Sequence, residues 1–418
     1  MPKLHLLINL LKSSAGVITT SLMSFCTFII VAKFETNYMF GVFAAAYAMA
    51  TLLSIVVDYG HQVRVLADFS EASKNNPSSL NATLNIKVKS LLFLGVVPVA
   101  LWVDYLSGLY ICISLLTSFF VMSIADFHLA FLRCSGKHWL DSKIKIETAL
   151  CQFLMLGIFS LLSRLYNGYF SLNVESILLS IFISRLYMLA RSRKHFDAVI
   201  QYEQGARLST IKGVGAIFKR GLAYFLDAAA SKSFVLLDAI LISAIFGPIS
   251  VGLYSVGQKL LQCFMPVGNV FINVMLPIMR KSKGALNLEV YLIAMTGVVA
   301  LALFLTLNTL GPWLIDLFFG ESFSDSKIYL YGISIVGVFR LGVFASGILL
   351  YSSGMQRHKA IVNVLGLVTL LSLTYTSEMV SVHSFIRVYT ISTITVMMIN
   401  VALYIADRLR SENNGKYN

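Results

Sequence analysis

The sequence predicts an all-α polytopic membrane protein, with twelve transmembrane helices in two six-helix lobes related by a pseudo-two-fold axis along the membrane normal. The 418 residues are 57% hydrophobic and 13% charged, with a mean hydropathy of +0.78, whereas soluble domains are about 25% charged. Apolar runs of spanning length recur along the whole chain, and basic residues gather in every second loop. The net charge of +13 therefore reflects membrane topology, and we expect no nucleic-acid partner.

Twelve apolar runs approach the length needed to cross a hydrocarbon core of about 30 Å, which takes about 20 helical residues. They are residues 14–33, 38–60, 87–106, 109–132, 145–163, 170–190, 221–246, 251–278, 289–310, 328–351, 360–377 and 383–406. The first run follows basic residues but continues at full spanning length without a small-residue cleavage site. We therefore expect a retained first helix rather than a signal peptide.

The charges of the loops orient these spans. If alternate loops face the cytoplasm, the outside loops hold only Lys33, Arg164 and Lys327, and the inside loops collect most of the other basic residues. Cytoplasmic loops of membrane proteins carry such an excess of Lys and Arg. We therefore expect both termini in the cytoplasm.

A basic connector at residues 191–220 divides the chain into an N-lobe, residues 1–190, and a C-lobe with a short cytoplasmic tail, residues 221–418. The two halves resemble each other in places. Residues 33–43 align with 244–254 at an offset of 211, and residues 131–138 align with 349–356 at an offset of 218. Because each half has an even number of spans, both insert in the same orientation, which predicts a parallel repeat.

The span at residues 221–246 carries three charges, Asp227, Lys232 and Asp238. The two aspartates share a helix face about 16 Å apart, and Lys232 lies near mid-depth on another face. Ionised side chains at this depth are unfavourable unless they face water or partners, so they mark a transport pathway by default. The alternative is a buried ion pair that only joins helices.

The next span, residues 251–278, carries a polar stripe. Gln258, Gln262, Asn269 and Asn273 fall within about 60° of arc, and Lys259 lies about 40° beyond them. Such a stripe is unfavourable in lipid, so it either lines a cavity or bonds to a neighbouring helix. We favour the cavity, because five polar residues exceed what helix pairing usually needs.

Arg340 lies near the middle of its span, too deep to reach the interface easily, and with Lys232 and Lys259 it completes a set of three deep cations in the C-lobe. In the N-lobe, Asp58 and Asp126 lie nearer the cytoplasmic ends of their spans, where ion coupling competes with simple exposure to headgroup water. Arg185 and Arg387 lie near span ends, so we expect their side chains to snorkel to the interface.

No sequence pattern points to an enzyme. The chain has no Gly-rich phosphate loop, no HExxH or paired CxxC motif and no Ser/His/Asp set on one surface. The five cysteines show neither a metal-ligand nor a disulfide spacing. We therefore expect no catalytic residue, no metal site and no cofactor.

Four segments are similar to segments of polysaccharide flippases. They are NYMFGVF and SVGLYSVGQKL at the starts of the second and eighth spans, VVDYG at the end of the second span and PWLIDLFFGESF before the tenth. With the twelve-span plan, they make the chain resemble the Wzx-type O-antigen flippases of the multidrug/oligosaccharidyl-lipid/polysaccharide exporter superfamily. Related flippases carry arginines in the first helix, and this sequence has none there.

The resemblance implies that the protein flips the O-antigen repeat unit for lipopolysaccharide biosynthesis. The substrate would be an undecaprenyl-diphosphate-linked oligosaccharide, moved from the cytoplasmic to the periplasmic leaflet of the bacterial inner membrane by alternating access. An H⁺ or Na⁺ ion is expected to couple to the cycle. Membrane lipid and other polysaccharide-assembly membrane proteins are the further partners we expect.

In this hypothesis Lys232, Lys259 and Arg340 engage the diphosphate or acidic sugars, and the Gln/Asn stripe contacts glycans. Asp227 or Asp238 pairs with the cations or couples the ion. Two alternatives remain. A multidrug cation antiporter of the same superfamily would favour an anionic, aromatic cavity, and a membrane polysaccharide polymerase would be expected to have a sizeable outside loop.

Overall fold

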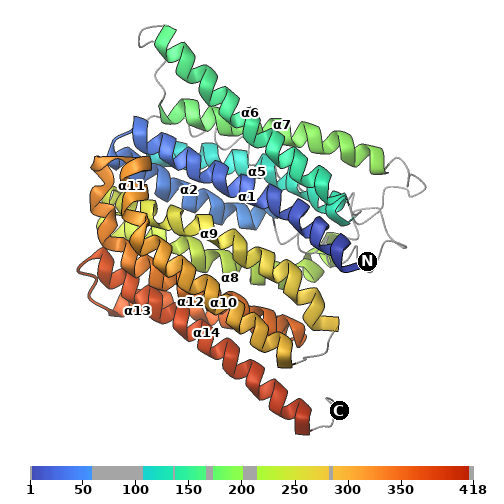
Figure 1. Ribbon diagram of the computed structural model, residues 1–418. Helices are drawn as coiled ribbons and strands as arrows, with labels where there is room; N and C mark the ends of the chain where they lie inside the picture. The colour runs from blue at the N-terminus through green and yellow to red at the C-terminus, as the bar shows by residue number, and fades with distance from the viewer. Residues whose placement is uncertain are drawn as a thin grey trace. The chain divides into compact units, whose positions relative to one another are not determined.

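The computed structural model describes residues 2–58, 107–134, 137–165, 173–200, 214–281 and 286–413, and this part of the chain is helical throughout, without a strand (Figure 1). The elements are α1 Pro2–Phe34, α2 Asn37–Asp58, α5 Ser107–Cys134, α6 His138–Leu165, α7 Val174–Ile200, α8 Val214–Phe246, α9 Pro248–Lys281, α10 Leu286–Thr309, α11 Gly311–Phe319, the 3₁₀ helix η3 Glu321–Ser326, α12 Lys327–Ser352, α13 Gln356–Thr376 and α14 Val382–Asn413. The prediction of an all-helical fold is confirmed.

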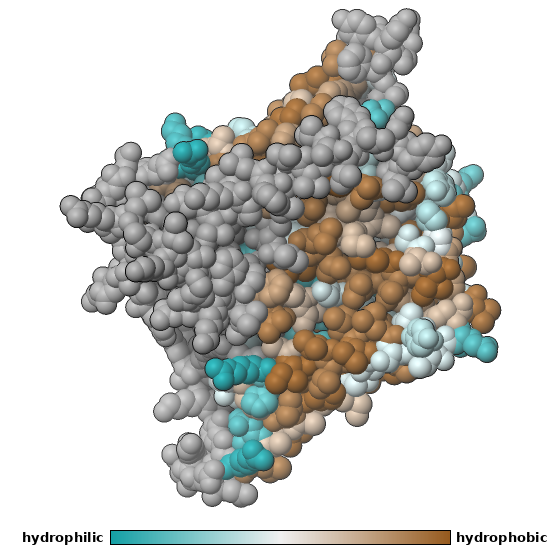
Figure 2. Space-filling model, turned by 180° about the vertical axis from the view of Figure 1, so that it is seen from behind, coloured by the Kyte–Doolittle hydropathy of each residue, from teal (hydrophilic) through white to brown (hydrophobic). Residues whose placement is uncertain are grey.

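Eight segments of the described residues are long and apolar enough to cross a membrane. They are Asn37–Ile55, Gly108–Arg133, His138–Ser163, Ala229–Phe246, Leu288–Thr309, Glu321–Ser352, Arg357–Thr376 and Val382–Arg410, and α1 adds a shorter apolar stretch at Ile18–Phe34. Large apolar side chains such as Leu154 and Val298 are exposed on these helices, as contact with lipid requires. Figure 2 shows apolar side chains over much of the described surface of one face, with hydrophilic ones toward its edges.

The predicted spans agree with the helices wherever the structure describes them. Of the twelve spans, 87–106 lies wholly outside the described residues, and 38–60 and 170–190 extend beyond them at one end. The structure adds two short elements that the sequence analysis treated as loop, α11 and η3. Helix α11 has a proline in its first turn, and Gly320, with φ 86°, ends it. The predicted connector 191–220 is partly helical, because α7 continues to Ile200 and α8 begins at Val214.

The chain divides into two compact units. One comprises Met1–Glu35 and Val42–Lys232, and the other comprises Thr36–Gly41 and Ser233–Asn418. The unit boundary thus crosses α2 after Gly41 and crosses α8 after Lys232.

Two hydrogen bonds between buried side chains join three helices of the first unit. Gln152 on α6 donates a hydrogen bond to Oγ1 of Thr27 on α1 at 3.0 Å, and its carbonyl oxygen accepts one from Oγ of Ser184 on α7 at 3.5 Å. All three side chains are buried. Hydrogen bonds of this kind hold helices together where lipid supplies no hydrophobic driving force between them.

Helix α12 is the central helix of the second unit and packs against α9, α10, α13 and α14. Its glycines allow close approach. A Cβ on Gly337 would lie 2.5 Å from Leu261 of α9 and 3.0 Å from Leu303 of α10, and a Cβ on Gly332 would lie 2.7 Å from Ile386 of α14. Small residues at helix crossings let side chains of neighbouring helices pack against the backbone.

Candidate functional site

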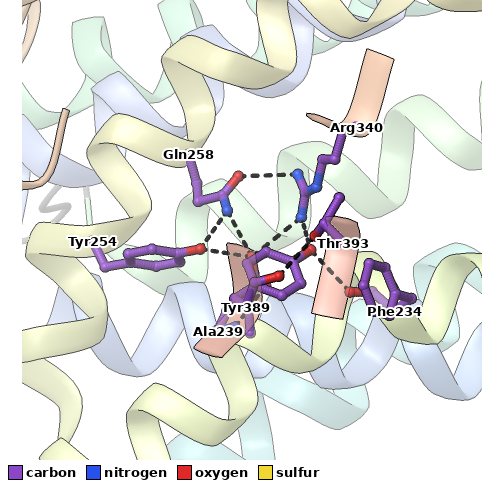
Figure 3. A network of polar contacts seen from close by, with 8 residues as sticks. Phe234, Ala239, Tyr254, Gln258, Arg340, Tyr389 and Thr393 are labelled. Carbon is purple, nitrogen blue, oxygen red and sulfur yellow. Dashed lines mark hydrogen bonds and ion pairs between the residues drawn. The ribbon is translucent and has the colours of Figure 1, made fainter. Parts of the chain in front are cut away.

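Four helices of the second unit bring a carboxylate, a guanidinium and three polar side chains together (Figure 3). We call this set the buried polar network; its members are Asp238 of α8, Tyr254 and Gln258 of α9, Arg340 of α12 and Tyr389 of α14. None of the five is more than 5% exposed. Polar groups enclosed to this degree must find their hydrogen-bond partners within the protein.

Asp238 is the main acceptor of the network. Its Oδ2 accepts hydrogen bonds from the hydroxyl of Tyr254 at 2.9 Å and from Nε2 of Gln258 at 2.7 Å. Its Oδ1 accepts the backbone N–H of Ala239 at 2.7 Å. Tyr254 and Gln258 are four residues apart on α9, so both lie on one face of that helix and reach the same carboxylate.

Arg340 balances the charge of this carboxylate. Its Nη2 lies 3.5 Å from Oδ2 of Asp238, and its Nη1 donates to Oε1 of Gln258 at 3.4 Å. Nη2 also donates to the hydroxyl of Tyr389, which in turn donates to the backbone carbonyl of Phe234 at 2.9 Å. The guanidinium carbon lies 5.0 Å from the centroid of the Tyr389 ring, in the range of a cation–π interaction.

One donor of this guanidinium has no partner. Nε of Arg340 is buried and makes no hydrogen bond with protein. The network therefore satisfies the carboxylate more completely than the cation. A planar guanidinium can bind carboxylates and phosphates through two N–H groups at once, so an incoming anion would compete with Asp238 for Arg340.

Three residues predicted from the sequence, Asp238, Gln258 and Arg340, thus meet in one network. The deep charges were interpreted as marking a transport pathway, with a buried ion pair as the alternative. In this conformation Arg340 follows the alternative, because it is only 5% exposed and is paired with Asp238. For Gln258 the structure supports the alternative that the polar stripe bonds to neighbouring helices. Its amide group hydrogen-bonds Asp238 of α8 and Arg340 of α12.

Of the other predicted residues of α8 and α9, Lys259 interacts electrostatically with Asp238 of the network. Lys259 is buried, and its Nζ donates to Oε1 of Gln262 on the same helix at 2.9 Å. Lys232 has an exposed side chain. The structure describes the helices that carry Asp227, Asn269 and Asn273 but does not describe these three side chains.

Both acids predicted in the N-lobe have partners in the structure. Asp58 accepts a hydrogen bond from Oγ of Ser123 at 3.3 Å. Asp126 of α5 interacts electrostatically with Arg185 of α7. Nε of Arg185 is buried without a hydrogen-bond partner, contrary to the expected snorkelling, and the side chain interacts electrostatically with Tyr47 and Asp126. Each unit thus holds an aspartate near an arginine.

Sequence reasoning missed both tyrosines of the network. Tyr254 could have been found from its place one turn before Gln258 on the polar stripe. Tyr389 carries no such signal, because the chain has 19 tyrosines and most of them suit a membrane interface equally well. Among the described residues, no group of three His, Cys, Asp or Glu side chains could hold a metal ion.

Comparison of the sequence with profiles of known protein families finds a match. The profile of a family described as "Polysaccharide biosynthesis protein" matches residues 6–283. No curated protein matches the chain.

The structure is similar to solved transporter structures over nearly its whole length. An outward-facing multidrug resistance MATE family transporter of the MOP superfamily matches with a TM-score of 0.68 and 14% identity, covering 99% of this chain and 96% of that one. An inward-facing transporter described in the same terms matches with a TM-score of 0.65 and 13% identity, over 96% and 99%. A MOP superfamily transporter from Pyrococcus furiosus, described as having a binding pocket of reverse polarity, matches with a TM-score of 0.64 and 15% identity, over 97% and 95%.

Proposed function

We propose, from the premise that the chain belongs to the polysaccharide biosynthesis protein family and has the fold of MOP superfamily transporters, that it flips a lipid-linked oligosaccharide across the membrane. The observation that carries the proposal is this combination of a polysaccharide family with a transporter fold. The substrate we propose is the undecaprenyl-diphosphate-linked O-antigen repeat unit, moved from the cytoplasmic to the periplasmic leaflet of the inner membrane.

The chemistry of such a substrate fits the polar groups of the second unit. A diphosphate–sugar headgroup is anionic and polar, so it cannot cross about 30 Å of hydrocarbon without polar contacts along the way. Arg340 of α12 is a buried cation with one unpaired donor, and Lys259 of α9 is a second buried basic residue. Asp238 neutralises Arg340 when no substrate is bound. In the proposed cycle an anionic headgroup takes the place of Asp238, which then binds the coupling ion.

The test is complementation of a bacterial strain that lacks its own O-antigen flippase but carries the matching glycosyltransferases. Expression of the protein should restore long-chain polysaccharide at the cell surface and remove the lipid-linked repeat units that accumulate in the cytoplasmic leaflet. Membrane levels of the protein, measured with a C-terminal tag, control for expression. A strain that holds the protein in its membrane and still lacks surface polysaccharide would contradict the proposal for that substrate.

A multidrug antiporter is the second candidate, because two of the similar structures are multidrug resistance transporters and a buried carboxylate such as Asp238 can bind a cation. The two functions separate in one strain. A flippase restores polysaccharide and leaves the inhibitory concentrations of cationic drugs unchanged. An antiporter raises those concentrations several-fold and leaves polysaccharide absent.

A further inference from the structure

The first turn of α2 belongs to the second unit, although the rest of that helix belongs to the first. Residues Thr36–Gly41 form part of the unit that otherwise begins at Ser233. The helix itself is continuous from Asn37 to Asp58. Any motion of one unit against the other must therefore either bend α2 after Gly41 or pull its first turn out of the second unit.

The first turn of α2 is held in an aromatic seat. Phe40 is 0% exposed, and its ring centroid lies 5.0 Å from that of Phe323 and 6.4 Å from that of Phe319, both in edge-to-face geometry. Nδ2 of Asn37 donates to the backbone carbonyl of Ser322 at 2.9 Å. The short elements α11 and η3 supply this seat, which gives a role to a segment that does not span the membrane by itself.

Backbone contact closes the other side of the seat. A Cβ on Gly41 would overlap the carbonyl group of Pro248, the first residue of α9. A Cβ on Gly252 of α9 would lie 3.1 Å from the carbonyl oxygen of Asn37 and 3.4 Å from Cα of Gly41. A side chain at position 41 would overlap the backbone of α9, and one at position 252 would require its neighbours to shift, so glycine at both positions lets the two helix starts approach closely.

These two glycines are equivalent in the internal repeat. Gly41 and Gly252 are separated by the offset of 211 that aligns residues 33–43 with 244–254. The start of the second helix in each half thus supplies one glycine to the same crossing. In transporters built from repeats, alternating access is largely a rigid-body rocking of one repeat against the other, and a crossing of repeat-related helix starts is a contact that such rocking could change.

We propose that the first turn of α2 is a releasable latch. Each time the transporter opens at the membrane face where α2 begins, Phe40 leaves the Phe319/Phe323 seat and Asn37 leaves Ser322. The inference rests on the proposed function, because it assigns the latch to the alternating-access cycle. The seat is lined by aromatic rings, and the side chain of Asn37 donates a hydrogen bond to Ser322 at its rim. A contact of this kind can reform after each cycle without covalent or ionic change.

A reversible cross-link tests the latch. In a background whose five native cysteines are replaced by alanine, Asn37→Cys with Ser322→Cys should form a disulfide on oxidation. We expect flipping by this protein in proteoliposomes to fall at least tenfold when oxidised and to recover on reduction. The single variants should keep the activity of the background. An oxidised pair that flips lipid as fast as its reduced form would overturn the proposal, because α2 would then bend rather than release.

A matched pair controls for rigidity of the second unit. Asn308 of α10 donates to Oγ of Ser334 of α12 at 2.9 Å, and neither residue contacts α2 in the described hydrogen bonds. Oxidised Asn308→Cys with Ser334→Cys should keep flipping within about twofold of its reduced form. Equal loss of activity in the control pair and the latch pair would assign the effect to general stiffening and overturn the latch.

A labelling experiment separates failure of the latch from failure of the proposed function. Phe323 is 0% exposed when the latch is closed, so Phe323→Cys should react with a membrane-impermeant maleimide only when the latch opens. We expect slow labelling that becomes several-fold faster when Phe40→Ala is added. Labelling at the same rate with and without Phe40→Ala would overturn the latch. Accelerated labelling in a protein that flips no oligosaccharide would keep the latch and reject the substrate.

Discussion

Asp238 and Arg340 form an ion pair that the second unit encloses almost completely. Removing two charges from water is unfavourable, and their attraction offsets this only when hydrogen bonds satisfy the remaining donors and acceptors. Tyr254, Gln258 and Tyr389 provide those bonds. The ion pair either takes part in transport or only joins α8 to α12. These two roles predict different results when both charges are removed together.

We therefore predict a split between stability and transport in three variants. Asp238→Asn or Arg340→Gln alone leaves one buried charge unpaired, which costs about 3–5 kcal/mol. The double variant has no such charge, so its free energy of unfolding should return close to that of the wild type. If the pair serves transport, the double variant still restores no surface polysaccharide. Thermal unfolding in detergent and polysaccharide complementation measure the two quantities.

Recovery of both stability and transport in the double variant would show that the ion pair has only a structural role in joining α8 to α12. Asn308→Ala is the matched control, since it removes a helix-joining hydrogen bond to Ser334 outside the network. We expect it to lower stability by about 1 kcal/mol and to leave complementation unchanged.

The charged members of the network could be predicted from the sequence, because an aspartate and an arginine inside apolar spans are conspicuous. Their pairing with each other could not, since it depends on which helices adjoin. Arg185 shows the same limit in the N-lobe. Its distance from the span end suggested snorkelling, but the side chains that interact with it electrostatically, Tyr47 and Asp126, lie on other helices.

At the scale of elements, each unit has a helix in which a tyrosine and an arginine one turn apart both bond a glutamate of a neighbouring helix. In the first unit Tyr187 and Arg191 of α7 both bond Oε2 of Glu147 on α6 at 3.1 Å. In the second unit Tyr404 and Arg408 of α14 bond Glu289 of α10 at 2.5 Å. The sequence contains a Tyr-x-x-x-Arg pattern at both places, but only the structure identifies its partners.

The first-unit arrangement lies in a basic environment. His195 follows Arg191 on α7, and burial, reinforced by Arg191 and Lys194, lowers the pKa of its imidazole. His195 is therefore neutral at pH 7, and the positive charge here comes from lysine and arginine alone. This is consistent with a cytoplasmic position for the end of α7.

We predict that the second-unit arrangement contributes more to stability than the first-unit one. Glu289 is nearly enclosed, with a side-chain exposure of 7%, whereas that of Glu147 is 22%. Glu289→Gln removes the carboxylate that pairs with Arg408 at a partly buried site, and we expect a loss of about 2–3 kcal/mol. Glu147→Gln should cost clearly less, because exposed ion pairs contribute little. Thermal unfolding of the two purified variants in one detergent compares them, and an equal loss in both would contradict this ranking.

A second element-scale prediction concerns packing against α12. Gly337→Ala would push against Leu261 and Leu303, whereas a Cβ on Gly297 of α10 has nothing within 4 Å. We expect Gly337→Ala to lose about 1–3 kcal/mol through overpacking. Gly297→Ala should be neutral or gain up to about 1 kcal/mol, because alanine favours a helix. Thermal unfolding of the two variants checks the prediction, and an unchanged Gly337→Ala protein would show that α9 and α10 can shift to admit a methyl group.

At the scale of the whole molecule, the spans were predictable because hydropathy measures the same transfer free energy that the bilayer imposes. The helix starts at Asn37 and Pro248 could be placed from the repeated glycine-aromatic segments. The fold of α11 and η3 could not be predicted, since a nine-residue segment that contains Pro312 and Asp316 and is followed by Gly-Glu-Ser is equally compatible with a loop. The seat these elements make for Phe40 is a tertiary property with no periodicity in the sequence.

The orientation of the molecule in its membrane remains a prediction from the loop charges. Both termini should face the cytoplasm, and the turn that contains Lys33 and the segment that contains Lys327 should face the periplasm. Green fluorescent protein fused after Asn418 should fluoresce, and alkaline phosphatase at the same position should be inactive. Fusions truncated after Asp316 should give the opposite pair of results, because α10 has then crossed outward. Active phosphatase after Asn418 would reverse the orientation and place the latch of α2 on the cytoplasmic side.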